Sequence, residues 1–352
     1  MNNKSGSPKR ATSQDVAKLA GVSRSVVSAV LNGTPGIGVS EQTRENVLAA
    51  IRELDYHVDA RARGMKTGRS MTLAAFGDTS HPLFMRLLEG MQRASGAEGY
   101  HLLLTSPGRG KAGEARAELL ELYQQRRIDG IVTLDDTSYA DEKWAQRVQA
   151  NGVPYVSVEG YAEFAGVCSV HADYRKSIET ALDYLWEKCS DKKFVPEYAE
   201  VFSLSHEGKV NWAEQQRRKG YEEWCREHKL EPKISRQLQQ AGRVDWQDWC
   251  RQRAESKQDS PPVLLNWSSA APDLYRSAYR FGLSIGTDLC IMAADNTIQG
   301  DLLSMPTLSC VEIPYAEMGE AAVRSVLLQI RGEAEKPSKL WLPAILKPGE
   351  SA

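Results

Sequence analysis

The chain has 352 residues and a formal net charge of −2, which allows two or three domains with a sizeable core. Its six cysteines show no C-x-x-C spacing and no neighbouring histidines, so neither a zinc site nor a disulfide framework is indicated, and no cofactor is expected. No signal peptide opens the sequence, and no apolar run approaches the roughly 20 residues that span a bilayer. We therefore expect a cytoplasmic protein without a membrane partner.

The charge is unevenly distributed along the chain. Residues 1–70 carry 11 Lys and Arg against 6 Asp and Glu, a net charge of +5, whereas the remainder carries 33 against 40, a net charge of −7. A basic N-terminal segment suits contact with phosphates, although a merely solvated surface has the same composition. The first residues are polar and contain Gly and Pro, and they are interpreted as a disordered arm.

Residues 12–32 predict two short helices joined by a tight turn. Thr12 and Asp15 resemble a variant capping box at the start of the first helix, and Gly21 ends it. Ser23 can cap the second helix. An apolar stripe on that helix leaves a second face free to enter a DNA groove, and the free face is expected to hold Arg24, Ser25, Ser28 and Ala29.

This stretch resembles the helix-turn-helix of the lactose-repressor-type (LacI/GalR) bacterial transcription regulators. The family pattern D-V-A-x-x-A-G-V-S-x-x-x-V-S-x-V-L-N is matched in register by residues 15–32. The resemblance implies base contacts by Arg24, Ser25 and Ala29. It also implies caps and phosphate contacts by Thr12, Ser23, Ser28 and Asn32.

A third helix is expected after the glycine-rich turn 33–38, with Ser40 as its cap. Its apolar residues would close a three-helix core against the first two helices, and the side chains expected to form that core are Val16, Leu19, Val27, Leu31, Val47, Leu48, Ile51 and Leu54.

Residues 55–69 resemble the hinge of the same family, which folds on operator DNA and inserts an apolar side chain into the minor groove. The resemblance implies DNA contacts by Ala62, Arg63 and Met65, with Met65 in the wedge position usually held by Leu. Val58, Asp59 and Gly64 depart from the family pattern. An ordinary flexible linker is the alternative.

From residue 71 the pattern changes to strands alternating with helices, which indicates parallel sheets with helices on both faces. Strands are expected at 71–76, 101–105, 129–134 and 153–158, with helices at 82–100, 114–127 and 141–151. Farther along, a helix is expected at 177–189 and a poorly marked strand within 193–204. Strands at 262–266, 290–296 and 306–311 and a helix at 274–282 follow, before the chain returns to its first lobe.

The resemblance implies an all-α helix-turn-helix head and an α/β two-lobed effector domain of the periplasmic-binding-protein type. The expected boundaries are an arm at 1–11, a head at 12–58, a hinge at 59–70 and an effector-binding and dimerisation domain at 71–352. Within it, the first lobe is expected at about 71–168 and 312–338, and the second at about 169–311 and 339–350.

The family binds a small molecule, usually a sugar, between its lobes. The resemblance implies effector contacts by Arg217, Asp295, Asn266 and Phe84, although Trp267 stands where an Asp is common. The expected partners are operator DNA, a small-molecule effector and a second copy of the chain, because one head reads few bases and two must act together.

Two other classes compete with this interpretation. An α/β enzyme is disfavoured because 108–112 lacks the order of a phosphate loop and no G-x-G-x-x-G follows the first strand. A solute-binding sensor or transport protein of the same two-lobed fold is disfavoured by the intact head. We therefore predict a ligand-responsive, DNA-binding repressor without enzymatic activity.

Overall fold

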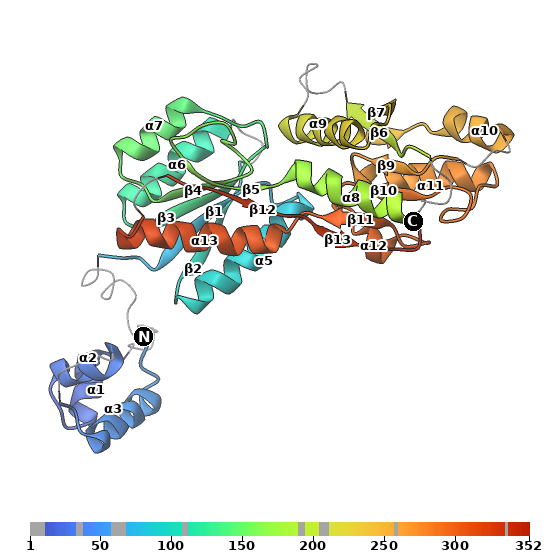
Figure 1. Ribbon diagram of the computed structural model, residues 1–352. Helices are drawn as coiled ribbons and strands as arrows, with labels where there is room; N and C mark the ends of the chain where they lie inside the picture. The colour runs from blue at the N-terminus through green and yellow to red at the C-terminus, as the bar shows by residue number, and fades with distance from the viewer. Residues whose placement is uncertain are drawn as a thin grey trace, which may run out of the picture. The chain divides into compact units, whose positions relative to one another are not determined.

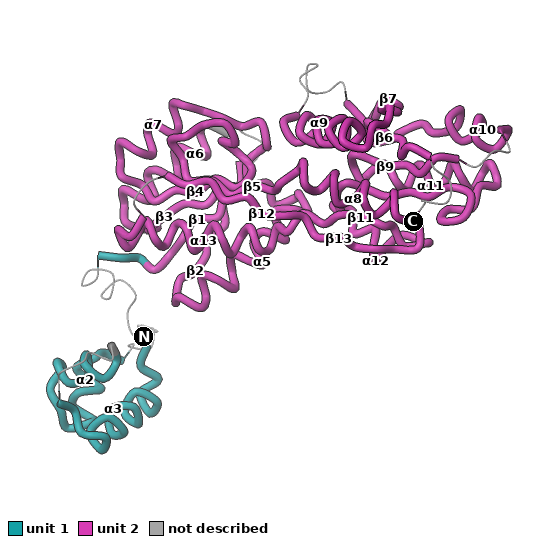
Figure 2. The backbone as a smooth tube through the Cα atoms, viewed as in Figure 1, with its two compact units in different colours: residues 1–70 teal, residues 71–352 magenta. Residues whose placement is uncertain are grey.

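The computed structural model describes residues 11–32, 38–57, 68–107, 112–188, 194–203, 211–256, 260–334 and 337–352. The chain divides into two compact units, residues 1–70 and 71–352, which Figure 2 colours separately. The expected minor-groove residues Ala62, Arg63 and Met65 lie outside the described residues.

Three helices form the first unit: α1 (Ser13–Leu19), α2 (Arg24–Asn32) and α3 (Glu41–Glu53). One face of each helix is apolar, so their shared core is built from Val16, Ala17, Val27, Val30, Val47 and Ala50. Two side chains that were expected in this core lie largely outside it, because Leu19 is 47% exposed and Leu48 is 38% exposed. Leu31, Ile51 and Leu54 pack at its edge.

The second unit, called here the two-lobed unit, contains two sheets that lie at its opposite ends in Figure 1. The first sheet is entirely parallel and has the order β12-β5-β4-β3-β1-β2. Its strands are β1 (Thr72–Phe76), β2 (His101–Thr105), β3 (Gly130–Leu134), β4 (Tyr155–Val158), β5 (Cys168–Ala172) and β12 (Lys339–Leu342).

Alternate residues of the strands face opposite layers of helices. On β1, Leu73 and Ala75 pack against α5 (Pro82–Ala97) and α13 (Tyr315–Arg331). Ala74 and Phe76 face α6 (Ala112–Gln124) and α7 (Glu142–Ala150). Both faces are therefore buried, which explains the nearly continuous apolar strand sequences.

Helices α5 and α13 approach so closely that Gly90 on α5 and Gly319 on α13 both lack room for a Cβ atom. A Cβ atom on Gly90 would lie 1.7 Å from the carbonyl oxygen of Ala316. This contact fixes the helix pair that covers one face of the first sheet.

The second sheet has the order β13-β11-β10-β9-β6-β7-β8, and its β13 and β8 strands pair antiparallel to their neighbours. Its strands are β6 (Glu197–Ser203), β7 (Lys233–Gln240), β8 (Arg243–Val244), β9 (Val263–Leu265), β10 (Ile291–Ala293), β11 (Ser309–Glu312) and β13 (Ile345–Lys347). Helices α8 (Tyr174–Lys188) and α9 (Trp212–Glu227) cover one face. The other face is covered by α10 (Gln247–Ser256) and α11 (Ala271–Arg280). The short helices η3 (Ser268–Ala270) and α12 (Gly300–Leu303) complete this lobe.

The chain passes between the sheets after β5, after β11 and between β12 and β13. This topology corrects the expected lobe boundaries, because β5 and residues 339–342 belong to the first sheet. Strand β12 pairs with β5 from Lys339 to Leu342 before the chain crosses to the second sheet. Within the described residues, no helix combines the length and apolar character needed to cross a membrane.

Candidate nucleic-acid interface and inter-lobe cavity

The first helix of the head begins at a reciprocal capping box. The backbone N–H of Thr12 donates to Asp15 Oδ2 at 2.8 Å, and the N–H of Asp15 donates to Thr12 Oγ1 at 3.4 Å. Two backbone donors that the helix leaves unpaired are satisfied in this way. The capping role predicted for Thr12 is confirmed.

The second helix follows a left-handed turn at Gly21, whose φ is 66°. The N–H of Val26 donates to Ser23 Oγ at 3.4 Å, which places Ser23 as the cap at the start of α2. Ser40 caps α3 in the same way, through a 3.2 Å hydrogen bond from the N–H of Thr43.

The polar side chains expected to read DNA are unequally accessible. Ser23, Arg24 and Ser25 are exposed at the start of α2, whereas Ser28 is half-buried. Ala29 was expected on the free face but is only 6% exposed, so its methyl group does not lie open to a base. The side chain of Asn32 lies outside the described residues. The accessible reading surface is thus concentrated at the N-terminal end of α2.

A cavity lies between the two sheets of the two-lobed unit. The charged and aromatic side chains that line it are Arg86, Tyr174, Arg217, Trp267, Asp295 and Tyr315. Arg86 comes from α5 beside the first sheet, while Arg217 comes from α9 beside the second. The cavity volume is about 10 Å³, which is room for about one water molecule. We call this space the inter-lobe cavity.

Hydrogen bonds connect the two lobes at two places. Thr137 donates to Asn211 Oδ1 at 2.6 Å, and the N–H of Trp212 donates to Ser138 Oγ at 2.8 Å, so the loop after β3 meets the start of α9. On the other side, Arg86 donates to the carbonyl oxygen of Asn296 at 3.0 Å. A ligand much larger than water fits the inter-lobe cavity only if the lobes move apart.

The structure brings together two of the four residues expected to bind an effector. Arg217 and Asp295 both line the inter-lobe cavity. Phe84 does not line it, because its ring is fully buried in the core between the first sheet and α5. The neighbouring Leu83 lines the cavity instead.

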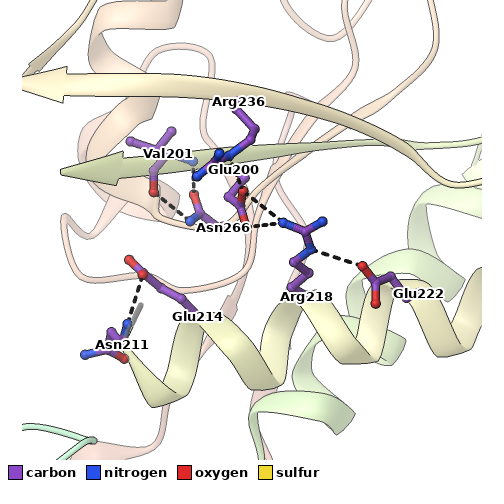
Figure 3. Close-up of polar contacts among 8 residues, drawn as sticks. All are labelled: Glu200, Val201, Asn211, Glu214, Arg218, Glu222, Arg236 and Asn266. Carbon is purple, nitrogen blue, oxygen red and sulfur yellow. Dashed lines mark hydrogen bonds and ion pairs between the residues drawn. The ribbon is translucent and has the colours of Figure 1, made fainter. Parts of the chain in front are cut away.

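Asn266 is also placed differently from the expectation. Its side-chain amide forms two hydrogen bonds of 2.9 Å with the backbone of Val201, donating to the carbonyl and accepting from the N–H (Figure 3). These bonds join the end of β9 to β6, so both polar atoms of the amide are already hydrogen-bonded within the sheet. Only its backbone carbonyl faces the site, where it accepts a 2.9 Å hydrogen bond from Arg217.

The carboxylate of Asp295 is held by its own loop. It accepts hydrogen bonds from the backbone N–H and hydroxyl of Ser268 and from the backbone N–H and hydroxyl of Thr297. Three of these donors bind Oδ2 and one binds Oδ1, so most acceptor positions of the carboxylate are used by these two residues. Asp295 therefore fixes the loop after β10.

Glu159 is a buried acid that the sequence interpretation missed. It follows β4 and accepts a 2.8 Å hydrogen bond from the hydroxyl of Tyr174, which lines the inter-lobe cavity. Burial raises the pKa of Glu159 to about 7, against the opposing effects of the Tyr174 hydrogen bond and the charge of Arg217. Its position after a buried parallel strand, where ligand sites of α/β sheets gather, was the available signal.

Comparison with known protein families agrees with this arrangement. Residues 12–59 match the family described as bacterial regulatory proteins, lacI family. Residues 70–242 match periplasmic binding proteins and sugar binding domain of LacI family, and residues 200–352 match the periplasmic binding protein-like domain.

Full-length relatives and solved structures extend the likeness over nearly the whole chain. The HTH-type transcriptional regulator MalR of Streptomyces coelicolor is 27% identical, with 96% of both chains covered. The HTH-type transcriptional repressor PurR of Erwinia tasmaniensis is 26% identical, with 93% of this chain and 92% of that protein covered. The lac repressor dimer bound to operator and the anti-inducer ONPF has the same fold, with a TM-score of 0.72 at 19% identity, covering 97% of this chain and 99% of that one.

Proposed function

Since the chain belongs to the lacI family of bacterial regulatory proteins and is a DNA-binding transcription regulator, we propose that it is a ligand-responsive repressor. In this proposal a homodimer binds a pseudopalindromic operator in the cytoplasm. A small molecule that enters the inter-lobe cavity then lowers its affinity for DNA.

The capped α2 helix is the observation that carries the proposal. Ser23 caps the start of α2, where Arg24 and Ser25 are exposed. Another face of α2 packs in the core of the head, which fixes the orientation of the helix. A guanidinium at that position can bind guanine O6 and N7 with two hydrogen bonds, which discriminates between bases by about 1–3 kcal/mol. We assign Arg24 and Ser25 to base contacts, and Thr12, Ser23, Ser28 and Asn32 to phosphate contacts. Ala62, Arg63 and Met65 are assigned to the minor groove.

Two copies of the chain are proposed because one head reads few bases and operator symmetry mirrors the symmetry of a dimer. The second lobe offers an apolar surface for the contact, since Leu302, Leu303 and Met305 are 71%, 75% and 93% exposed. The lac repressor, which has the same fold, is described as a dimer bound to its operator.

The switch is proposed to act through the closure of the lobes. An effector can shift the protein between two arrangements only by binding one of them more tightly. Opening of the lobes would break the contacts of Thr137 and Ser138 with the start of α9. We assign Arg217 and Asp295 to the effector site. The role of Asp295 there is to order the loop after β10.

The test is a selection of genomic DNA fragments by the full-length protein at moderate salt. The expected product is a pseudopalindromic sequence with two half-sites. Arg24→Ala is expected to relax the preference at one symmetric base pair by about 1–3 kcal/mol. Arg44→Ala, which removes an exposed charge from α3, is the matched control and is expected to leave the base preference unchanged.

Two results would contradict the proposal. Failure to select any sequence, with or without candidate ligands, would favour a solute-binding protein of the same fold. Affinity for the selected operator that rises when the effector is added would contradict relief of repression.

A further inference from the structure

Arg217 is a buried cation that pairs with no acid in the described residues. Its side chain is fully buried, and Nη1 donates one hydrogen bond of 2.9 Å to the carbonyl oxygen of Asn266. Nε is buried and has no hydrogen-bond partner among the residues that the structure describes. Across the described parts of the chain, no carboxylate forms an ion pair with this guanidinium. Twelve other arginines of the two-lobed unit pair with an acid within 3.5 Å (Arg86, Arg93, Arg116, Arg175, Arg218, Arg236, Arg243, Arg251, Arg253, Arg276, Arg324 and Arg331).

Two aromatic rings lie beside the charge. The guanidinium carbon lies 4.1 Å from the ring centre of Trp267 and 5.0 Å from that of Tyr174. The side chain is fully buried beside these rings, so the guanidinium has lost its hydration. Cation–π attraction and one hydrogen bond recover only part of the cost of burying a charge.

The nearby acids are engaged elsewhere. The four donors from Ser268 and Thr297 occupy the carboxylate of Asp295. Glu159 lies behind Tyr174, and its pKa is raised to about 7 by burial, so near neutral pH a large share of it is uncharged. The other guanidinium that lines the inter-lobe cavity, Arg86, adds positive charge and is paired with Glu312 at 3.5 Å.

We propose that the effector of this protein carries an anionic group, a carboxylate or a phosphate, which binds the unpaired edge of Arg217. This inference rests on the proposed function, because it names the chemical class of the ligand at the same site. A guanidinium forms two parallel hydrogen bonds with such a group, and one of them would satisfy Nε. The lobes open to admit the ligand and close on it through the contacts of Thr137 and Ser138 with α9.

The test compares the melting temperature of the full-length protein with inorganic phosphate, glucose 6-phosphate and glucuronate, and with glucose as the neutral probe. At a concentration about 100 times the dissociation constant, a bound anion is expected to raise the melting temperature by roughly 5–10 °C. Glucose is expected to leave it unchanged. Glucose 6-phosphate and glucuronate distinguish a phosphate from a carboxylate as the preferred group.

Three variants locate the effect. Arg217→Met removes the charge with an apolar chain of similar length, and it is expected to abolish the shift while the ligand-free protein melts no lower than the wild type. Arg217→Lys keeps the charge without the two-pronged geometry and is expected to reduce the shift. Arg218→Met is the matched control, because Arg218 is the next residue of α9 and pairs with Glu200 and Glu222 at the surface (Figure 3). It is expected to keep the full shift.

The proposal is overturned if none of the three anions raises the melting temperature, or if glucose raises it as much as glucose 6-phosphate. It is also overturned if Arg217→Met and Arg217→Lys both keep the wild-type response. Selection of operator DNA is measured separately with the same protein. Loss of DNA selection with an intact anion response would contradict the proposed function alone, and the reverse result would contradict this inference alone.

Discussion

Replacement of Asp135 by alanine is expected to destabilise the two-lobed unit by about 3–5 kcal/mol, the usual cost of leaving a buried charge without its partner. Asp135 lies directly after β3, and its side chain is 1% exposed. It forms an ion pair with Arg116 of α6, whose side chain is 6% exposed. Burial alone would lower the pKa of Arg116, but the charge of Asp135 raises it overall, which is the sign of a tightly paired guanidinium.

The magnitude follows from what the alanine leaves behind. Asp135 Oδ2 also accepts hydrogen bonds from the hydroxyls of Thr133 at 2.6 Å and Ser157 at 2.7 Å. Without the carboxylate, the partners left to Arg116 in the described residues are aromatic faces, including the ring of Tyr139 at 4.4 Å. A loss of this size corresponds to a melting temperature lower by roughly 6–15 °C in a unit of this length.

The assay is urea and thermal unfolding of the full-length protein, followed by far-ultraviolet circular dichroism, with the head and the two-lobed unit treated as separate transitions. The control is the double variant Arg116→Met, Asp135→Leu, in which apolar side chains replace the buried pair. Such replacements are often neutral or stabilising, so the double variant is expected to recover most of the lost stability. A loss below about 1 kcal/mol for Asp135→Ala, or a double variant as unstable as the single one, would refute the reasoning.

The remaining predictions concern the head, the pH dependence and the dimer. Thr12→Ala removes the capping box and is expected to cost the head about 1 kcal/mol in thermal unfolding, whereas an unchanged melting curve would contradict the cap. Because burial raises the pKa of Glu159 from 4.5 to about 7, the folded protein holds a proton that the unfolded chain has lost, and stability falls as the pH rises between those values. Glu159→Gln is expected to remove this fall of roughly 3 kcal/mol, and identical pH profiles for variant and wild type would contradict the assignment. Leu303→Asp is expected to shift the dimer towards monomer in analytical ultracentrifugation. Gln252→Asp, which adds the same charge to an exposed position on α10, is the control. Equal dimer fractions for the two variants would exclude the surface around Leu303 as the dimer contact.

Local sequence determined those features whose partners lie a few residues away. The Thr12–Asp15 capping box, the Ser23 and Ser40 caps and the Gly21 turn each involve residues within three positions of one another, so spacing alone predicts them. The buried strands of the first sheet are apolar on both faces and flanked by turns, and for this reason their positions were also predictable.

Polar elements escaped the sequence interpretation. Strand β7 has the sequence KISRQLQQ and α10 has the sequence QDWCRQRAES, and neither shows the apolar run or period that identifies a buried element. β7 is a strand because it pairs with β6 along seven positions. The neighbouring strand, and not the residues of β7 themselves, stabilises the extended conformation.

Tertiary structure alone decided which functional groups are available in the inter-lobe cavity. The sequence placed Arg217, Asp295, Asn266 and Phe84 near a site, but it could not show that the amide of Asn266 is committed to Val201 or that Phe84 belongs to the core. The physical reason is that a side chain's availability depends on partners far away in sequence, which only folding brings within hydrogen-bonding distance. The same long-range packing leaves the guanidinium of Arg217 buried beside two rings and unpaired with any acid of the described residues, and the ligand's charge is inferred from this feature.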